Sequence, residues 1–238
     1  MLPALRHRHR RLCPGTRALR GALASVLLSA ASVAQAQTSA NLSLVSDYAV
    51  RGLSLSDGRP AAQLRVGYDS PSGWYAGGFV SSVHPAYSPA QAQLIAYGGY
   101  ARRTASGMSW DVGASRTSFV HDARYDYHEL HAGLALERGN LRANYSPDYY
   151  GAGRGVYLEW NGVHPLGERW GLVGHAGVLR RIEAYGHDGG PARIDLRLGL
   201  AHDAGPCTMQ LAWVARQRDR LAAAPRARAL TASVSFAF

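Results

Sequence analysis

The sequence lacks several features that define common protein classes. It contains no lysine, so all 26 basic residues are arginine, which we interpret as a compositional bias rather than as a functional signal. Its only cysteines are Cys13 and Cys207. No segment approaches the roughly 18 consecutive apolar residues that indicate a membrane-spanning helix. No linker rich in proline or serine and no block of like charge divides the chain, which indicates a single main domain.

The first 36 residues predict a signal peptide that is removed on export. A basic segment with six arginines and no acid comes first, an apolar segment follows, and residues 34–36 (Ala-Gln-Ala) form a cleavage site. Cleavage between Ala36 and Gln37 leaves Cys207 as the single cysteine, which excludes an intramolecular disulfide. It also lowers the formal net charge from +10 to about +4, which argues against nucleic-acid binding. We therefore expect a mature domain of residues 37–238.

Residues 230–238 have the alternation of a membrane-spanning strand. Leu230, Val234 and Phe238 are among the apolar residues at every second position, so one face of this strand is apolar. An aromatic residue at the end of the strand suits the boundary between membrane and water. This ending resembles the signal that the bacterial barrel-assembly machinery reads, and we predict that Phe236 and Phe238 form that signal.

Short segments of alternating polarity recur along the rest of the chain, without the period of a helix. They number about twelve, and single-chain bacterial outer-membrane barrels have an even number of strands. Short turns alternate with longer loops, as expected for periplasmic turns and external loops. The predicted strands are residues 41–53, 61–70, 73–82, 91–103, 108–119, 126–137, 141–148, 155–165, 170–181, 192–202, 207–216 and 229–238.

The polar faces of these segments distinguish a membrane barrel from a soluble one. In segment 192–202, apolar residues at even positions oppose arginine, aspartate and glycine at odd positions. A soluble barrel would carry many long charged side chains on its outer face, whereas isolated charges mixed with glycine, serine and glutamine suit an enclosed wet interior. The alternation predicts that the following side chains point inward and line a pore: Asp47, Arg51, Arg65, Asp69, Asp111, Glu129, Arg142, Glu159, Arg193, Asp195 and Arg197.

We therefore expect an all-β fold, a transmembrane antiparallel up-and-down β-barrel of about twelve strands in the outer membrane of a Gram-negative bacterium. Both ends of the mature chain are expected on the periplasmic side. Aromatic residues near predicted strand ends are typical of the interfacial belts of such barrels. The candidates are Trp74, Tyr100, Trp110, Tyr125 and Trp170.

Several motifs of the mature chain resemble the TorF family of proteobacterial porins. The specific matches are residues 45–54 (VSDYAVRGLS) and 145–151 (YSPDYYG). The resemblance implies an outer-membrane location and a pore role, without a defined substrate. Weaker matches are residues 56–57, 60–63, 72–77, 97–100 and 109–113, and the sequence departs from the family pattern at Val50, Leu55, Phe79 and Gln93.

Motifs for catalysis or metal binding are scarce. His128, Glu129 and His131 are close in sequence, but on a strand Glu129 and His131 share one face while His128 lies on the other, so the three cannot converge on a metal ion. No nucleophile motif accompanies the other histidines. We expect no enzyme activity, no cofactor and no metal site.

An arginine-rich segment near the end of the chain leaves two interpretations open. Its guanidinium groups bind lipopolysaccharide phosphates, or they are solvated loop residues. Outer-membrane lipid and, during insertion, the barrel-assembly machinery are the other expected partners, and the sequence does not indicate an oligomeric state. The arginines are Arg216, Arg218, Arg220, Arg226 and Arg228.

The sequence favours a porin or narrow channel for the passive passage of small solutes or ions. Barrels of about eight strands are filled by side chains and those of about sixteen are open, so the bore of a twelve-stranded barrel depends on its inward side chains. Two alternatives stay open. One is a non-conducting barrel whose external loops make adhesive or surface contacts, and the less favoured one is an outer-membrane lipid-modifying enzyme.

Overall fold

The structure is a computed structural model that describes residues 37–86, 88–182, 192–216 and 228–238. The predicted signal peptide and residues 217–227 of the arginine-rich segment lie outside the described residues. The structure therefore does not test the predictions made for those two segments.

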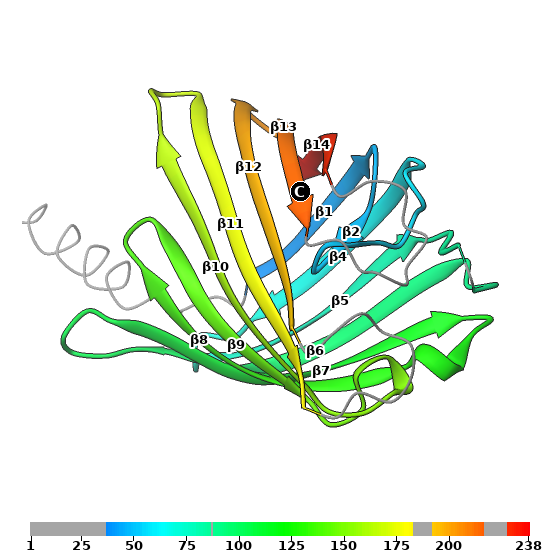
Figure 1. The fold of residues 1–238 in the computed structure, drawn as a ribbon. Coiled ribbons are helices and arrows are strands. Elements are labelled where there is room, and N and C mark those ends of the chain that lie inside the picture. The colour runs from blue at the N-terminus through cyan, green and yellow to red at the C-terminus, as the bar shows by residue number, and fades with distance from the viewer. Residues whose placement is uncertain (1–36, 87, 183–191, 217–227) are drawn as a thin grey trace, which may run out of the picture. The chain divides into compact units, whose positions relative to one another are not determined.

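Twelve strands form a closed antiparallel barrel (Figure 1). Each strand pairs with its neighbours along the chain, and the barrel closes where β1 pairs with β14, with Leu42 opposite Phe236. The strands are β1 (Gln37–Val45), β4 (Ala61–Asp69), β5 (Trp74–Ser82), β6 (Ala92–Arg103), β7 (Ser109–Val120), β8 (Tyr127–Leu136), β9 (Gly139–Ser146), β10 (Gly155–Pro165), β11 (Trp170–Arg181), β12 (Ala192–Ala204), β13 (Cys207–Arg216) and β14 (Arg228–Ala237).

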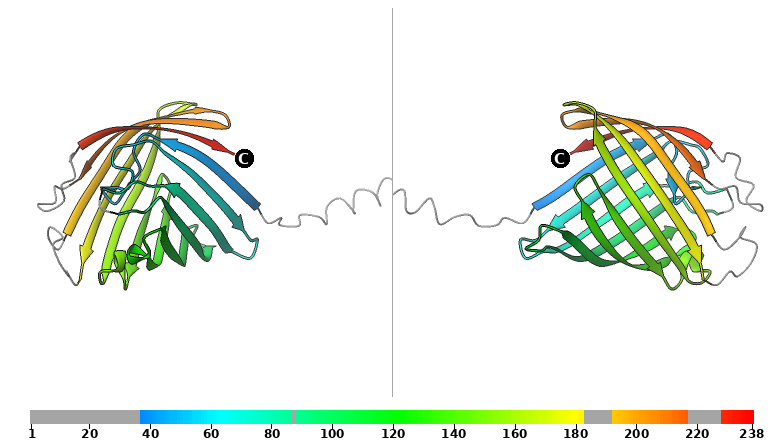
Figure 2. Two further views of the ribbon diagram at one scale, coloured as in Figure 1. Left: turned by 90° about the vertical axis from the view of Figure 1, so that its right-hand side faces the viewer. Right: turned by 60° about the vertical axis from the view of Figure 1, so that its left-hand side comes forward.

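The predicted all-β antiparallel barrel of about twelve strands is confirmed. Four short elements lie between the barrel strands: β2 (Ala49–Val50), β3 (Leu53–Ser54) and the 3₁₀ turns η1 (Ala123–Tyr125) and η2 (Tyr149–Gly151). All four lie on connections at the end of the barrel opposite the short turns. We call this end the loop end, and the other the turn end. Figure 2 shows the strands winding around the barrel from two further directions.

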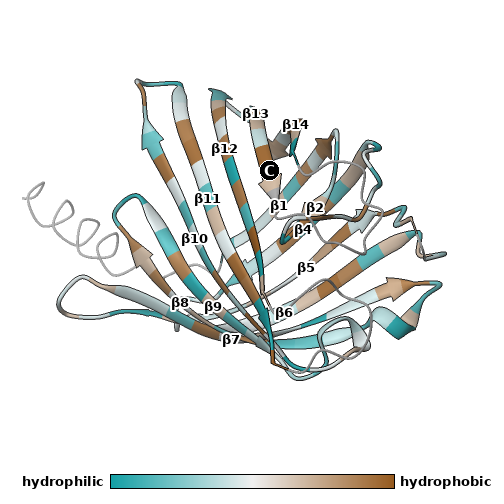
Figure 3. Cartoon of the chain, viewed as in Figure 1, coloured by the Kyte–Doolittle hydropathy of each residue, from teal (hydrophilic) through white to brown (hydrophobic). Residues whose placement is uncertain are grey.

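The two faces of the barrel wall differ in polarity because successive side chains of a strand point to opposite sides. Leucines at every second position are exposed on the outer face, as for Leu44 (58% exposed) and Leu198 (53% exposed). The intervening positions carry Gly, Ser, Thr, Tyr and charged residues, and Figure 3 shows the resulting bands of alternating hydropathy along the strands. Exposed apolar residues thus surround the barrel, and its interior holds the polar ones together with a buried apolar cluster that includes Leu55, Val83 and Phe119.

The first predicted strand is wrong in extent. Residues 41–53 were expected to be one strand, but β1 ends at Val45 and the chain then turns into the short β2–β3 hairpin. The hairpin turn is Arg51-Gly52, with φ of 49° and 75°, which is the left-handed pair that a two-residue type I′ turn requires. The other eleven predicted strands match the observed ones within two residues at each end.

Aromatic side chains cluster near the turn end of the barrel. Trp74 lies at the start of β5 with its ring 5.2 Å from Tyr100, which is 6.0 Å from Trp110. Tyr125 lies in η1 at the loop end, where its ring packs edge-on against Phe119 and against the buried apolar cluster. Among the described residues, no helix is long and apolar enough to cross a membrane.

Candidate functional site in the barrel lumen

Nine of the eleven predicted pore-lining residues lie on the inner face of the wall. Their positions alternate with the exposed apolar residues of the same strands. The predicted placement of Asp47 and Arg51 on a strand is wrong, because both belong to the connection between β1 and β4 and not to a wall strand. The nine are Arg65, Asp69, Asp111, Glu129, Arg142, Glu159, Arg193, Asp195 and Arg197.

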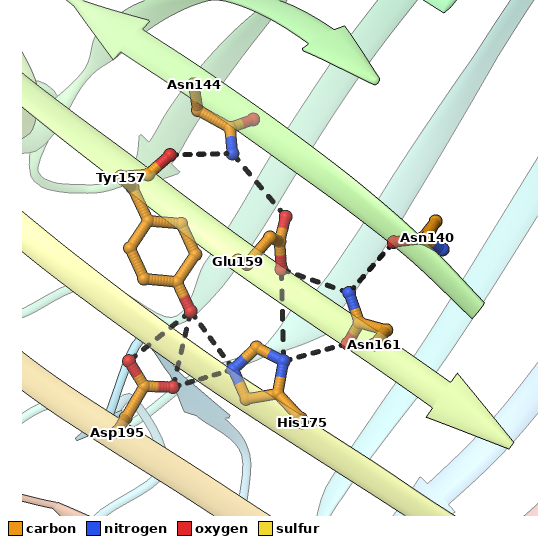
Figure 4. A network of polar contacts seen from close by, with 7 residues as sticks. All are labelled: Asn140, Asn144, Tyr157, Glu159, Asn161, His175 and Asp195. Atoms are coloured by element: carbon orange, nitrogen blue, oxygen red, sulfur yellow. Dashed lines mark hydrogen bonds and ion pairs between the residues drawn. The ribbon is translucent and has the colours of Figure 1, made fainter. Parts of the chain in front are cut away.

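On the inner side of the wall, a histidine of β11 joins β10, β11 and β12 (Figure 4). The Nε2 atom of His175 lies 2.8 Å from Oδ1 of Asp195. The Tyr157 hydroxyl lies 3.0 Å from the same nitrogen and donates to the Asp195 carboxylate at 3.3 Å. Asp195 is buried, at 4% exposed, so the carboxylate depends on these two partners in place of water.

The second nitrogen of the same ring continues the network toward β9. Nδ1 of His175 lies 2.8 Å from Oδ1 of Asn161, whose Nδ2 donates to Glu159 at 3.4 Å and to Asn140 at 3.2 Å. Because Glu159 can only accept, it orients the Asn161 amide with its oxygen toward the ring. Both ring nitrogens of His175 therefore lie within hydrogen-bond distance of side-chain oxygens, Asp195 and Tyr157 at Nε2 and Asn161 at Nδ1.

A second network of the same type lies on β5, β7, β8 and β9. The Oδ2 atom of Asp111 lies 3.1 Å from Nη2 of Arg142 and 3.3 Å from Nε2 of His131. The Tyr75 hydroxyl lies 2.8 Å from His131 Nε2 and donates to Asp111 at 3.2 Å. Arginine, histidine and tyrosine thus surround one carboxylate, so this part of the wall carries little uncompensated charge.

Glycines opposite tyrosines let the inner rings lie flat against the wall. On β5 and β6, Tyr75 pairs with Gly99 and Tyr97 pairs with Gly77 in the antiparallel register. A Cβ added to Gly77 would lie 2.5 Å from the Val66 carbonyl oxygen and would collide with the Tyr97 hydroxyl. The Tyr-x-Gly spacing on each strand therefore places each ring over the glycine of the other strand.

The connection of residues 46–60, which we call the inner hairpin, is fixed at its base by a carboxylate. Oδ1 of Asp47 accepts hydrogen bonds from Ser54 Oγ at 2.5 Å, Ser56 Oγ at 3.0 Å and the Gly58 amide at 3.3 Å. A side chain predicted to line the pore instead bonds locally to its own turn. Aspartate commonly makes such local bonds, which compete with strand pairing and explain why β1 stops before Asp47.

Further contacts attach the inner hairpin to the wall at β5 and β6. The Tyr48 hydroxyl donates to Gln93 Oε1 at 2.6 Å, and the His84 amide donates to the Leu55 carbonyl at 2.7 Å. Leu55 and Val83 are fully buried in the main apolar cluster of the barrel. The hairpin base is therefore packed against the inside of the wall.

The tip of the inner hairpin reaches the opposite wall through Arg51. Its guanidinium group forms a two-pronged ion pair with Glu129 on β8, at 2.7 and 3.0 Å. It also lies over the rings of Tyr149 in η2 and Tyr157 on β10, with Cζ 5.2 and 4.4 Å from the ring centroids. Both charged side chains are 10% exposed, so ion pairing and cation–π contacts replace most of their water.

The connections at the loop end carry their own polar bonds. The Asp122 carboxylate accepts from Arg124 Nε and Nη2, at 2.8 and 3.0 Å, and from Ser88 Oγ at 2.6 Å. The hydrogen bonds from Arg124 and then Ser88 lower the pKa of Asp122 from 3.8 to about 2. These bonds tie the β7–β8 connection to the β5–β6 connection.

His128, Glu129 and His131 lie on two different faces of β8. His131 and Glu129 lie on the inner face, while His128 bonds through Nδ1 to Asp148 at 2.8 Å in the β9–β10 connection. Within the ranges that the structure describes, no group of three His, Cys, Asp or Glu side chains is placed to hold a metal ion.

The sequence predictions missed several residues that form the lumen. The predicted set contains only charged residues at inward positions of the strands. The inward positions also include polar aromatic and amide residues: Tyr75, His131, Tyr157, Asn161 and His175. The same alternation would have identified them if polar aromatic and amide side chains had been included. Strand alternation does not identify Tyr149, because this residue lies in the 3₁₀ turn η2 and not on a strand. The backbone at the next residue, Tyr150, is left-handed, with φ of 51°.

Comparisons with known proteins identify a family and a fold. A family model described as a bacterial protein of unknown function (Gcw_chp) matches residues 29–237. No curated protein matches the sequence. A structure of the KdgM porin is 10% identical, with a TM-score of 0.57, covering 84% of this chain and 99% of that chain.

Two further porin structures have the same degree of similarity. A complex of the KdgM porin with disordered oligogalacturonate is 9% identical with a TM-score of 0.55, covering 86% of this chain and 99% of that chain. The NanC porin is 13% identical with a TM-score of 0.56, covering 84% of this chain and 99% of that chain. At this level of identity, the similarity shows a shared barrel fold.

Proposed function

We propose a channel function from the premise that this chain belongs to the Gcw_chp family of bacterial proteins and has the fold of the KdgM and NanC porins. In this proposal the protein is an outer-membrane channel for the passive passage of small solutes or ions. The observation that carries it is the division of the wall into an exposed apolar outer face and a charged, hydrogen-bonded inner face. A wall of this kind separates lipid from a wet interior.

The dimensions of the barrel support a narrow bore. Barrels of about eight strands are filled by side chains, and those of sixteen or more enclose an open aqueous channel. The twelve strands observed lie between these limits, and the inner hairpin occupies part of the enclosed space. We therefore infer that the channel passes small solutes and excludes large ones.

The proposal includes export and assembly. Cleavage between Ala36 and Gln37 would release the barrel domain at the first residue of β1, and amino-terminal sequencing of outer-membrane protein tests that site. Phe236 and Phe238 are proposed to be read by the barrel-assembly machinery. Membership of the TorF family and contact with lipopolysaccharide belong to the same proposal.

Liposome swelling tests passage directly. Purified folded barrel is reconstituted into vesicles, and uptake is compared for a pentose, a hexose, a trisaccharide and an acidic disaccharide, because one neighbouring porin was solved with an oligogalacturonate. We expect swelling rates that fall with solute size, with heat-unfolded protein as the control. Vesicles that contain folded barrel and yet exclude even the pentose would favour the alternative of a non-conducting barrel with surface-contact loops.

A further inference from the structure

The inner hairpin lies inside the barrel and packs against the buried apolar cluster on the inner side of the wall. It is connected to β1 and β4, while the residues that its tip contacts lie on β8 and β10. Three strands separate β4 from β8, and four separate β1 from β10 on the other side of the ring. Arg51 therefore meets the wall roughly opposite the point where the hairpin leaves it.

The hairpin is held at both its base and its tip. At the base, Asp47 fixes the turn, and Tyr48 bonds to Gln93 on β6. At the tip, the planar guanidinium of Arg51 is paired with Glu129 and stacked on two tyrosine rings. An element restrained at both ends narrows the lumen permanently, whereas one restrained only at the base would swing.

The two segments with the most specific sequence motifs meet at this point. Residues 45–54 supply Arg51, and residues 145–151 supply Tyr149. Tyr149 and Tyr150 also pack against Tyr127 on β8, with centroids 5.2 and 5.0 Å away. The η2 turn thus provides an aromatic surface for the Arg51 guanidinium.

We propose that the inner hairpin is the constriction of the channel, and that Arg51, held by Glu129 and the Tyr149 and Tyr157 rings, determines its width. This inference rests on the proposed channel function. Solutes then pass the hairpin on the side of the lumen bounded by β11 to β14. The residue at position 51 governs both the size of solute admitted and the steadiness of the open current.

Single-channel recording with variants of the hairpin tests the constriction. Arg51→Ala and Glu129→Gln each release the tip, so we expect a larger and noisier open current than in the native protein. Replacing residues 49–54 with a two-glycine link removes the constriction, and we expect conductance to rise about threefold or more. Arg51→Lys retains the charge without the planar stacking surface and is expected to give an intermediate current.

Arg169→Ala is the matched control, because it removes an exposed arginine from the short turn between β10 and β11, outside the inner hairpin. Its conductance should equal that of the native protein. Each variant is first checked for a folded band that shifts on boiling, and if Arg51→Ala does not fold, the glycine-linked variant decides the question.

The outcomes separate the two proposals. A native protein that conducts, with Arg51→Ala and the glycine-linked variant at the same conductance, would overturn the constriction and leave the channel function standing. A silent native protein with a conducting glycine-linked variant would overturn the passage beside the hairpin, because the hairpin would then close the lumen completely. If neither folded protein conducts, both proposals fail.

Discussion

At the scale of single residues, the polar contacts of the lumen centre on carboxylates, each of which has its own basic or hydroxyl partners. Asp195 and Asp111 each contact a histidine and a tyrosine, and Glu129 is paired with an arginine. In an enclosed space an unpaired carboxylate is costly, because it loses water without gaining a partner. These side chains therefore stabilise the barrel in addition to determining the charge of its interior.

Asp195→Ala is predicted to destabilise the barrel. The change leaves the His175 ring and the Tyr157 hydroxyl without their shared acceptor, so we expect a loss of about 2–3 kcal/mol in the free energy of unfolding. Asp69→Ala is the control, since Asp69 is an exposed acid on the inner face of β4, and its effect should stay within about 0.5 kcal/mol. Urea unfolding in detergent measures both, and equal effects would show that the network is not stabilising.

Acid sensitivity of the loop end is predicted from Asp122. Its pKa is lowered from 3.8 in the unfolded chain to about 2 in the barrel, so its contribution to stability is present above the unfolded value and is lost as pH falls toward about 2. Asp122→Asn should therefore flatten the decline in stability across that interval. Urea midpoints measured at several pH values between these limits provide the check, and an unchanged slope would contradict the assignment.

Residue parity predicted the inner face well but not the role of each residue on it. The guanidinium of Arg65 lies over the Phe79 ring at 4.9 Å and the Tyr97 ring at 5.9 Å, contacts that no alternation rule reveals. Asp47 was misplaced because alternation ignores the tendency of aspartate to bond to its own turn. Contacts across the lumen depend on three-dimensional closure, which the local sequence does not contain.

At the scale of elements, paired glycines and tyrosines explain the spacing of motifs on β5 and β6. Tyr75 and Tyr97 each lie over a glycine of the partner strand, so each strand needs a glycine two residues from its tyrosine. Strand positions were predictable because turns and polarity alternate regularly along the chain. The inner hairpin was not, because its Arg-Gly turn lacks the Asn-Gly or Asp-Gly pair that signals such a turn.

Gly77→Ala is predicted to weaken the β5–β6 pair. The new methyl group would meet the Tyr97 hydroxyl and the Val66 carbonyl, and overpacking of this kind costs about 1–3 kcal/mol. Gly78→Ala is the matched control on the outer face, where the nearest side-chain atom, Val66 Cγ2, is 3.7 Å away. Thermal unfolding followed by gel shift compares them, and equal midpoints would show that the ring does not require the glycine.

Phe238 is predicted to act through both its side chain and its backbone. Its amide donates to the Ala40 carbonyl at 2.9 Å and its carbonyl accepts from the Ala40 amide at 3.3 Å, which extends the seam between β14 and β1. Phe238→Ala keeps these bonds and loses the ring, so we expect the folded yield to fall by about half or more. Phe238→Tyr should restore the yield, and deletion of Phe238 should lower it furthest. Equal yields for Phe238→Ala and the native protein would contradict the assembly role.

At the scale of the whole molecule, closure of the sheet gives the barrel an apolar outer face and a polar, enclosed inner face. The outer face exposes leucine, valine and tryptophan, and the inner face holds charges of both signs in the networks described above. The inner hairpin lies within this wall, and Arg193 and Arg197 lie on the inner face of β12. No single sign of charge dominates the predicted set of lining residues, so we expect weak ion selectivity.

Single-channel recording in a planar bilayer under a salt gradient tests the central claim that ions pass through this lumen. We predict discrete current steps and a reversal potential close to zero for the native barrel. Arg193→Ser with Arg197→Ser should shift the reversal potential toward cation preference, while Leu198→Ser on the outer face should impair assembly and leave selectivity unchanged. Folded protein without current steps, or a conducting double variant without a cation shift, would contradict the account.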